Sequence, residues 1–398
     1  MAFYLNPPAR WWGEALPDLR WSFTAAVVTL IAVVVKGGRL EPFRFVETRL
    51  YLAFVIYLVF QTVWALNTTV HLEFVVMAFN FLMLIYLLQS TVKTRDDLVV
   101  FCVITMMGCS YFTYIGLTSS WGGRLDGIGA ASIASSNQMA QHVAAMLMPG
   151  AFLLMQRQQS WWRYGIVLFL SAACLKVILM AGSRGVYLGI LITAIIALIF
   201  YPKGSKKRLY FFAALGVSVG LVFIGPTLMQ RFGGVQLTNL GEATDQSARS
   251  RVVILEAQWE MFKQAPLLGH GHKGTLLMSP IFIPKEYLSR NASEGLAGRA
   301  SHNYLMSLLV DHGLVGASIL LIIIFRCLVP LRRLSRQALV GEADSMRLLV
   351  MGLMLGLLCL VIAGMASDHK NSETSIWFFA LIPLFLKKIE LKVIEHAA

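Results

Sequence analysis

Long apolar segments alternate with shorter polar ones along most of this chain. Eleven of them approach the length of roughly 20 residues that a helix needs to cross a bilayer. These segments are 21–35, 51–66, 74–90, 98–117, 137–155, 163–181, 186–201, 209–228, 303–325, 346–366 and 374–387. The pattern predicts an all-α polytopic membrane protein with about eleven transmembrane helices.

One long polar segment, residues 229–302, divides the apolar segments into two groups. We expect eight transmembrane helices over 1–228, a loop over 229–302, and three helices with a tail over 303–398. Within the loop, residues 246–264 are predicted to form an amphipathic helix, and residues 265–299 to be irregular. The helix is predicted because apolar residues recur at helical spacing. They are Val252, Leu255, Trp259 and Phe262.

The composition agrees with a membrane protein. Of the 398 residues, 57% are hydrophobic and only 14% are charged, whereas soluble domains carry about 25% charged residues. The formal net charge of +13 could indicate nucleic acid. The basic residues, however, lie mainly in the short loops between apolar segments, which is the distribution of the positive-inside rule. We therefore expect membrane lipids and no nucleic acid as partners.

Lys and Arg are distributed unequally between alternate loops, and this predicts the orientation of the chain. Twenty lie in the loops within 36–50, 91–97, 156–163, 202–208 and 326–347 and in the C-terminal tail. The opposite short segments carry five, namely Arg10, Arg20, Arg124, Arg184 and Lys370. The first set is therefore predicted to be cytoplasmic, together with the C-terminus, and the long loop to face outward.

This orientation also places the N-terminus outside. Residues 4–8 read like the end of an earlier helix, so we expect the gene to begin upstream with one more helix. A native eleven-helix protein is the alternative.

His302 stands where the long loop meets the next apolar segment. Ser301 is a favourable N-cap, so His302 is predicted to lie in the first turn of that helix. The positive end of a helix dipole disfavours imidazolium, which keeps the ring neutral and able to accept a proton. The alternative is a polar residue that marks the start of a helix.

Arginines in the predicted outward segments are candidates for phosphate binding. Arg184 interrupts two apolar segments almost without a loop, and a charge there indicates a functional site. The alternative is a side chain that reaches the lipid headgroups. Arg249 and Arg251, before the loop helix, are ordinary surface residues when taken alone. Because guanidinium groups bind phosphate oxygens bidentately, Arg184 and Arg251 together are predicted to hold a lipid diphosphate.

Three further patterns favour structural interpretations. Residues 269–274 match GxGxxG, but no strand precedes them, so nucleotide binding is rejected. A metal site of His270, His272 and His302 is not expected, because the loop has no obvious carboxylate. Residues 368–370 (Asp-His-Lys) are interpreted as a solvated turn.

Taken in chain order, the motifs resemble those of the O-antigen ligase and polymerase superfamily of bacterial envelope proteins. The resemblance covers roughly residues 120–370. Its motifs are Arg124, Asn137, Ser183-Arg184-Gly185, Arg251, residues 265–271, and Ser301-His302-Asn303-Tyr304-Leu305 followed by Asp311, Gly313 and Gly316. Residues 4–7 are similar to a branch of O-glycosylation ligases associated with exosortase systems.

The resemblance implies about twelve helices, a GT-C-like arrangement and a large periplasmic loop that contains a helix. It implies transfer of a glycan, without metal or other cofactor, from undecaprenyl diphosphate to an acceptor hydroxyl such as that of the lipid A–core, in the bacterial inner membrane. His302 would be the general base, and Arg184 and Arg251 would hold the diphosphate. Substrate would also contact Arg124, Asn137, Arg249 and Asn303.

Three alternatives to a ligase stay open. A repeat-unit polymerase and a protein O-oligosaccharyltransferase belong to the same superfamily. A polysaccharide or lipid transporter belongs to another class, but transporters often show an internal repeat and mid-membrane polar groups. This sequence has no such repeat, and its polar residues gather on the predicted outer face.

Overall fold

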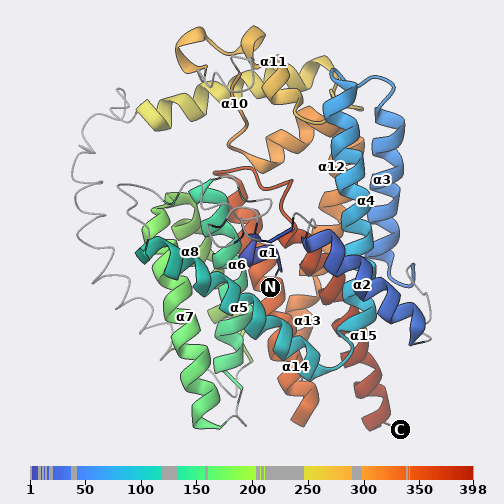
Figure 1. The fold of residues 1–398 in the computed structure, drawn as a ribbon, viewed down its shortest axis with the longest axis vertical. Helices are drawn as coiled ribbons and strands as arrows, with labels where there is room; N and C mark the ends of the chain where they lie inside the picture. The colour runs from blue at the N-terminus through green and yellow to red at the C-terminus, as the bar shows by residue number, and fades with distance from the viewer. Residues whose placement is uncertain are drawn as a thin grey trace.

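The structure is a computed structural model. It describes residues 2–7, 10, 13, 16–17, 21–36, 43–118, 125, 133, 135–156, 160–202, 207, 210, 246–288, 298–337, 339 and 341–397. The elements over these residues are all helices, which confirms the all-α prediction. Figure 1 shows long helices side by side, with two helices of the loop lying across one end.

The N-terminal helices are α1 (Ala2–Leu5), α2 (Trp21–Val35), α3 (Val46–Gln61), α4 (Thr68–Thr91), α5 (Arg95–Thr118), α6 (Ser136–Leu154), α7 (Trp161–Ala181) and α8 (Arg184–Phe200). The remaining elements are α10 (Gln246–Gln264), α11 (Gly274–Phe282), the 3₁₀ turn η4 (Lys285–Tyr287), α12 (Tyr304–Leu328), α13 (Pro330–Arg336), α14 (Gly341–Gly364) and α15 (Thr374–Ala397).

The helices form a polytopic membrane protein. Among the described residues, α4, α5, α7, α12 with α13, and α14 are long and apolar enough to cross a bilayer, and α2 and α8 are shorter apolar helices. Large apolar side chains such as Phe169, Ile199 and Phe325 are more than half exposed. In water such a surface would be an interaction site or an aggregation hazard, whereas in a bilayer it faces lipid.

The predicted apolar segments correspond to helices, apart from 209–228, of which the structure describes only residue 210. The second segment, predicted over 51–66, is displaced toward the N-terminus at both ends, since α3 runs from Val46 to Gln61. The Gln61 side chain donates hydrogen bonds to the carbonyls of Leu268 and Asp311. Asn67 then caps α4 by accepting a hydrogen bond from the Val70 amide.

Helix α14 is the centre of the bundle and is buried along most of its length. It packs against α6, α8, α12 and α15. Small residues allow this close approach: Gly352 lies against Pro149 and Phe152, and Gly356 lies against the backbone of Ala145. Packing through small residues is typical of helices in membranes.

Helix α1 lies inside the bundle rather than on its surface. Phe3 and Tyr4 are buried, and the Tyr4 hydroxyl is 2.8 Å from His142 Nε2. The other ring nitrogen of His142 is 2.7 Å from Thr374 Oγ1. This network connects α1, α6 and α15 and accounts for the burial of His142 in α6.

Helices α10 and α11 lie at the end of the bundle opposite the C-terminus, at the top of Figure 1. We refer to this end as the loop end. Helix α10 has the bounds predicted from the sequence. The expectation of an irregular segment over 265–299 was wrong, since α11 and η4 form there. The reason is that α11 packs against α10 and α12, so tertiary burial stabilises a short helix that local sequence does not predict.

Candidate functional site

The loop end is held to the bundle at a break in α12. Gly313 has φ 61° and ψ −170°, a backbone conformation that is essentially restricted to glycine. This break exposes backbone groups that pair with the turn after α10. The amides of Leu314 and Val315 donate to the carbonyls of Pro266 and Leu267, over 2.8 and 3.1 Å.

Glycines of the 269–274 motif also help to attach the loop to α12. Gly269 and Gly271 have φ of 64° and 88°, and the Gly271 amide donates to the Asp311 carbonyl over 2.8 Å. A Cβ on Gly269 would collide with the backbone of α12. The glycines therefore permit close backbone contact between the loop and α12.

The turn that carries His302 is organised by α10. Gln258 is buried, and its Nε2 donates to Ser301 Oγ over 2.8 Å and to Thr275 Oγ1 over 3.4 Å. Ser301 Oγ in turn accepts from the Asn303 amide over 3.1 Å. Gln258 was not among the residues predicted from the sequence. Its position beside the buried Ala257 and Met261 is the signal, because a polar residue on a buried helix face needs an internal partner.

The predicted cap of α12 was wrong by two residues. Asn303, not Ser301, is the N-cap, and its side chain accepts from the Met306 amide over 3.0 Å. Ser301 instead closes a local turn with Asn303 and binds Gln258, so it is not available to cap the helix. His302 consequently lies just before α12 rather than in its first turn.

His302 is partly buried and has an electropositive environment. Burial lowers the pKa of its imidazole, and the positive charges of Arg299 and Arg251 lower it further, while Asp368 opposes them. The ring is therefore neutral at pH 7, which is the form that a general base requires. The neutral state was predicted, but its main cause is burial and neighbouring charge rather than the helix dipole.

Arg251 of α10 lies close enough to His302 to affect its pKa. It is exposed and lies seven residues before Gln258, hence on the same face of the helix. Since Gln258 contacts Ser301, Arg251 is oriented toward the same side as the His302 turn, in agreement with its effect on the pKa of His302. Arg249 is also exposed, at the first turns of α10.

Arg184 begins α8, with an exposed side chain. Its neighbour Gly185 lies against Ala366, just beyond the end of α14. The chain continues from Ala366 into Asp368, whose carboxylate binds Ser307 of α12. Arg184 and the His302 turn are therefore both joined to the segment after α14, which places them at the same end of the bundle.

Residues 368–370 are not the solvated turn that was expected. His369 is 3% exposed and stacks on Tyr304, with ring centroids 4.2 Å apart. Lys370 Nζ contacts Asp311 and lies 3.3 Å from Asp368 Oδ2. Burial alone would lower the pKa of Lys370, but Asp311 and Asp368 raise it, so the ammonium is retained. The turn is buried because its partners come from α12. Those partners are distant in sequence, so the residues of the turn alone do not predict its burial.

Of the remaining predicted substrate-binding residues, the structure describes Asn137 but not Arg124. Asn137 is half-buried in the first turn of α6, and the neighbouring Gln138 donates to the Asp368 carbonyl over 2.9 Å. This brings the start of α6 to the same segment after α14. Arg124 lies outside the described residues.

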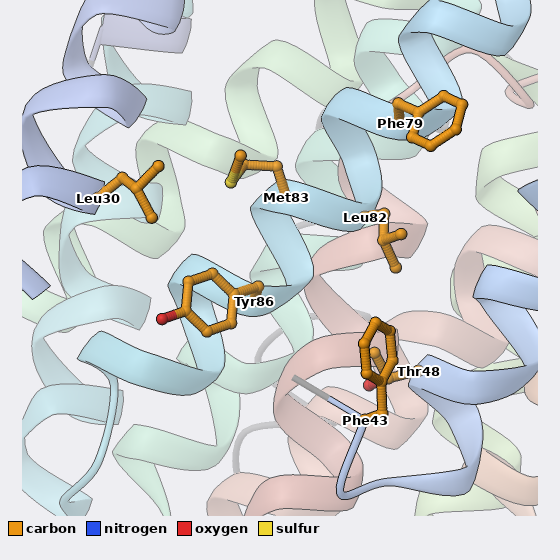
Figure 2. Close-up of a pocket in the computed structure, with 7 residues that line it drawn as sticks. All are labelled: Leu30, Phe43, Thr48, Phe79, Leu82, Met83 and Tyr86. Atoms are coloured by element: carbon orange, nitrogen blue, oxygen red, sulfur yellow. The ribbon is translucent and has the colours of Figure 1, made fainter. Parts of the chain in front are cut away.

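An apolar cavity of about 370 Å³ lies between α2, α4 and the start of α3. Figure 2 shows its lining, which is Leu30, Phe43, Thr48, Phe79, Leu82, Met83 and Tyr86. None of the predicted site residues lines it. The lining has few polar groups to orient a sugar or a phosphate, so this cavity is not the candidate site.

The comparisons with known proteins agree with the motifs. Residues 169–321 match the O-antigen ligase family. The matched segment contains Arg184, Arg249, Arg251, His302 and Asn303, whereas Arg124 and Asn137 precede it. No curated protein matches the chain. This match of residues 169–321 confirms the resemblance of the chain to the O-antigen ligase and polymerase superfamily.

Proposed function

We propose that the protein is a glycan ligase of the bacterial inner membrane. It transfers a glycan from undecaprenyl diphosphate to an acceptor hydroxyl of the lipid A–core at the periplasmic face. The observation that supports this most is the His302 turn: a partly buried, neutral imidazole that Gln258 of α10 positions beside Arg251, within the family segment. The excess of Lys and Arg in the opposite loops supports the periplasmic orientation.

In this proposal the donor diphosphate lies against Arg184 and Arg251, and its lipid tail lies between helices. His302 takes the proton from the acceptor hydroxyl while that oxygen attacks the anomeric carbon. The bond from that carbon to the diphosphate breaks, and the lipid diphosphate leaves with the electron pair. A single direct displacement inverts the anomeric configuration. Asn303, Asn137, Arg124 and Arg249 would contact the sugars.

Proton transfer to His302 and positive charge at the leaving diphosphate should contribute comparably to the rate of transfer. Proton transfer to a positioned base accelerates reactions by about 10²–10⁴-fold. Fixed positive charge at the leaving diphosphate contributes as much or more, because it acts where negative charge develops and water is scarce. The transfer step needs no metal, since arginines replace the divalent ion that many enzymes use at phosphates.

The proposal is tested in a strain that lacks the gene, complemented with the wild type, His302→Ala, Arg251→Ala or Arg184→Ala. Lys285→Ala is the matched control, because Lys285 is an exposed cation in the same loop. We expect the three site variants to insert normally, to lose lipopolysaccharide that carries polymer, and to accumulate lipid-linked polymer. Normal transfer by His302→Ala would remove His302 from the mechanism.

The same analysis distinguishes the alternatives within the superfamily. Accumulation of single lipid-linked repeat units would indicate a polymerase. Loss of glycoprotein with unchanged lipopolysaccharide would indicate transfer to a protein hydroxyl. Either outcome would change the acceptor and leave the chemistry of His302 as proposed, since acceptor choice depends on the site rather than on the fold.

A further inference from the structure

We propose that His272, Asp311 and His312 form a binding site for a divalent transition-metal ion of the zinc class. Their ligand atoms all lie within 4.8 Å of one another, and all three residues are buried. His272 lies in the turn between α10 and α11, whereas Asp311 and His312 lie in α12. A metal at His272 was not expected from the sequence, because its loop has no obvious carboxylate. The fold supplies one from α12.

The hydrogen bonds of His312 leave Nε2 as the ring nitrogen that can bind a metal ion. His312 Nδ1 is 2.9 Å from Gln61 Oε1, which can only accept. The amide of the same side chain donates to the carbonyls of Leu268 and Asp311, which fixes its orientation. His312 Nδ1 therefore carries the proton, and Nε2 presents a lone pair. Nε2 is buried without a hydrogen-bond partner among the described residues.

His272 offers a second buried imidazole nitrogen. Its ring stacks on Phe74, with centroids 4.0 Å apart and planes at 3°, and its Nδ1 is buried without a partner in the described part of the chain. Two buried nitrogens without partners are unusual, because a buried polar atom that makes no hydrogen bond is destabilising.

Asp311 is held ready as the third ligand. Its Oδ1 accepts from the Thr275 amide over 3.2 Å, and its Oδ2 accepts from the Lys273 amide over 3.1 Å. Lys370 is the cation that now contacts Oδ2. Lys370 also binds Ser307 and Asp368, so it keeps two partners if a metal takes its place at Asp311.

The donor set indicates the class of ion. Two imidazole nitrogens and one carboxylate oxygen suit Zn²⁺ and related ions, with a fourth position for water. Calcium and magnesium prefer sites made of oxygen alone. Gln61 orients His312, and two backbone amides orient Asp311, as is usual for residues that bind a metal ion. The ion would fasten the loop that carries α10 and α11 to α12, and it is not part of glycan transfer.

The test uses the full-length chain, purified without a polyhistidine tag and reconstituted in nanodiscs. After incubation with zinc chloride and desalting, the wild type should retain about one zinc per chain by elemental analysis. His272→Ala and His312→Ala should retain less than about a tenth of that. His270→Ala is the matched control, because His270 lies in the same turn and its ring already binds the Met261 carbonyl.

Cobalt gives a second measurement, because Co²⁺ bound to the wild type should show the visible bands of a low-coordinate site. Zinc should also raise the Tm of the wild type and of His270→Ala, but not that of the double variant His272→Ala/His312→Ala. Lys370→Met should bind zinc more tightly, because the competing ammonium is removed. No zinc on the folded wild type, or equal zinc on the double variant, would overturn the proposal. Loss of zinc from folded Lys370→Met would also contradict it.

Discussion

At the scale of single residues, His302 depends on its neighbours for its proposed chemistry. Burial and two arginines keep its imidazole neutral, while Asp368 acts in the opposite direction. Since a general base acts in its unprotonated form, a lowered pKa extends activity toward lower pH. The acid limb of the pH–rate profile should therefore lie below the ordinary histidine pKa of about 6.5.

Two substitutions should move this limb in opposite directions. Arg299→Gln removes a positive charge, so the pKa of His302 should rise. The acid limb should then move to higher pH than in the wild type. Asp368→Asn removes a negative charge, so the limb should move to lower pH. The measurement is initial transfer rate against pH for both variants. Shifts of the same sign would contradict this description of the site.

Gln258 provides a further prediction at this scale. The Gln258→Ala variant loses the hydrogen bond to Ser301 that positions the His302 turn. A hydrogen bond of this kind contributes about 1 kcal/mol, so we expect a loss of roughly fivefold to tenfold in kcat. The KM for the donor should change little, because Arg184 and Arg251 remain. A change in donor KM with unchanged kcat would place Gln258 in donor binding instead.

At the scale of elements, the break in α12 determines where the loop attaches. Gly313→Ala should be destabilising for two reasons, namely its backbone conformation and the contact of a new Cβ with the Leu267 carbonyl. A backbone of this kind costs a non-glycine residue about 1–3 kcal/mol before any clash is added. Thermal unfolding should show a clear loss of stability.

Gly341→Ala is the matched control for this prediction. Gly341 has a positive φ of 59°, but a Cβ there would meet open space. Gly341→Ala should therefore lower stability only through the unfavourable backbone conformation, by about 1–2 kcal/mol. Equal Tm values for the two variants would show that the contact between α12 and the loop contributes no stability.

The elements also show what the sequence could predict. Helical spacing predicted α10 with its observed bounds, and hydropathy predicted the membrane helices. Spacing alone could not show which face of α10 is buried. Ile254 and Met261 pack inside, while Val252, Leu255 and Trp259 remain exposed. In the same way, the burial of Lys370 and the carboxylate beside His272 depend on α12, which is distant in sequence.

At the scale of the whole molecule, the proposal requires the loop end to face the periplasm. The five cysteines are all buried, so the native chain offers little background for thiol labelling. Lys285→Cys, in the loop, should react with an impermeant maleimide in cells whose outer membrane alone is permeabilised. Arg332→Cys, in α13, should react only after lysis. The reverse pattern would invert the proposed topology.

The most direct measurement of the central claim is single-turnover transfer by the purified protein in proteoliposomes that contain a defined undecaprenyl-diphosphate glycan and a hydroxyl acceptor. The wild type should form an inverted glycosidic bond. His302→Ala should bind the donor with similar affinity and be slower by about 10²–10⁴-fold. Transfer by His302→Ala at the wild-type rate, or movement of the donor across the bilayer with no bond formed, would contradict the proposed mechanism.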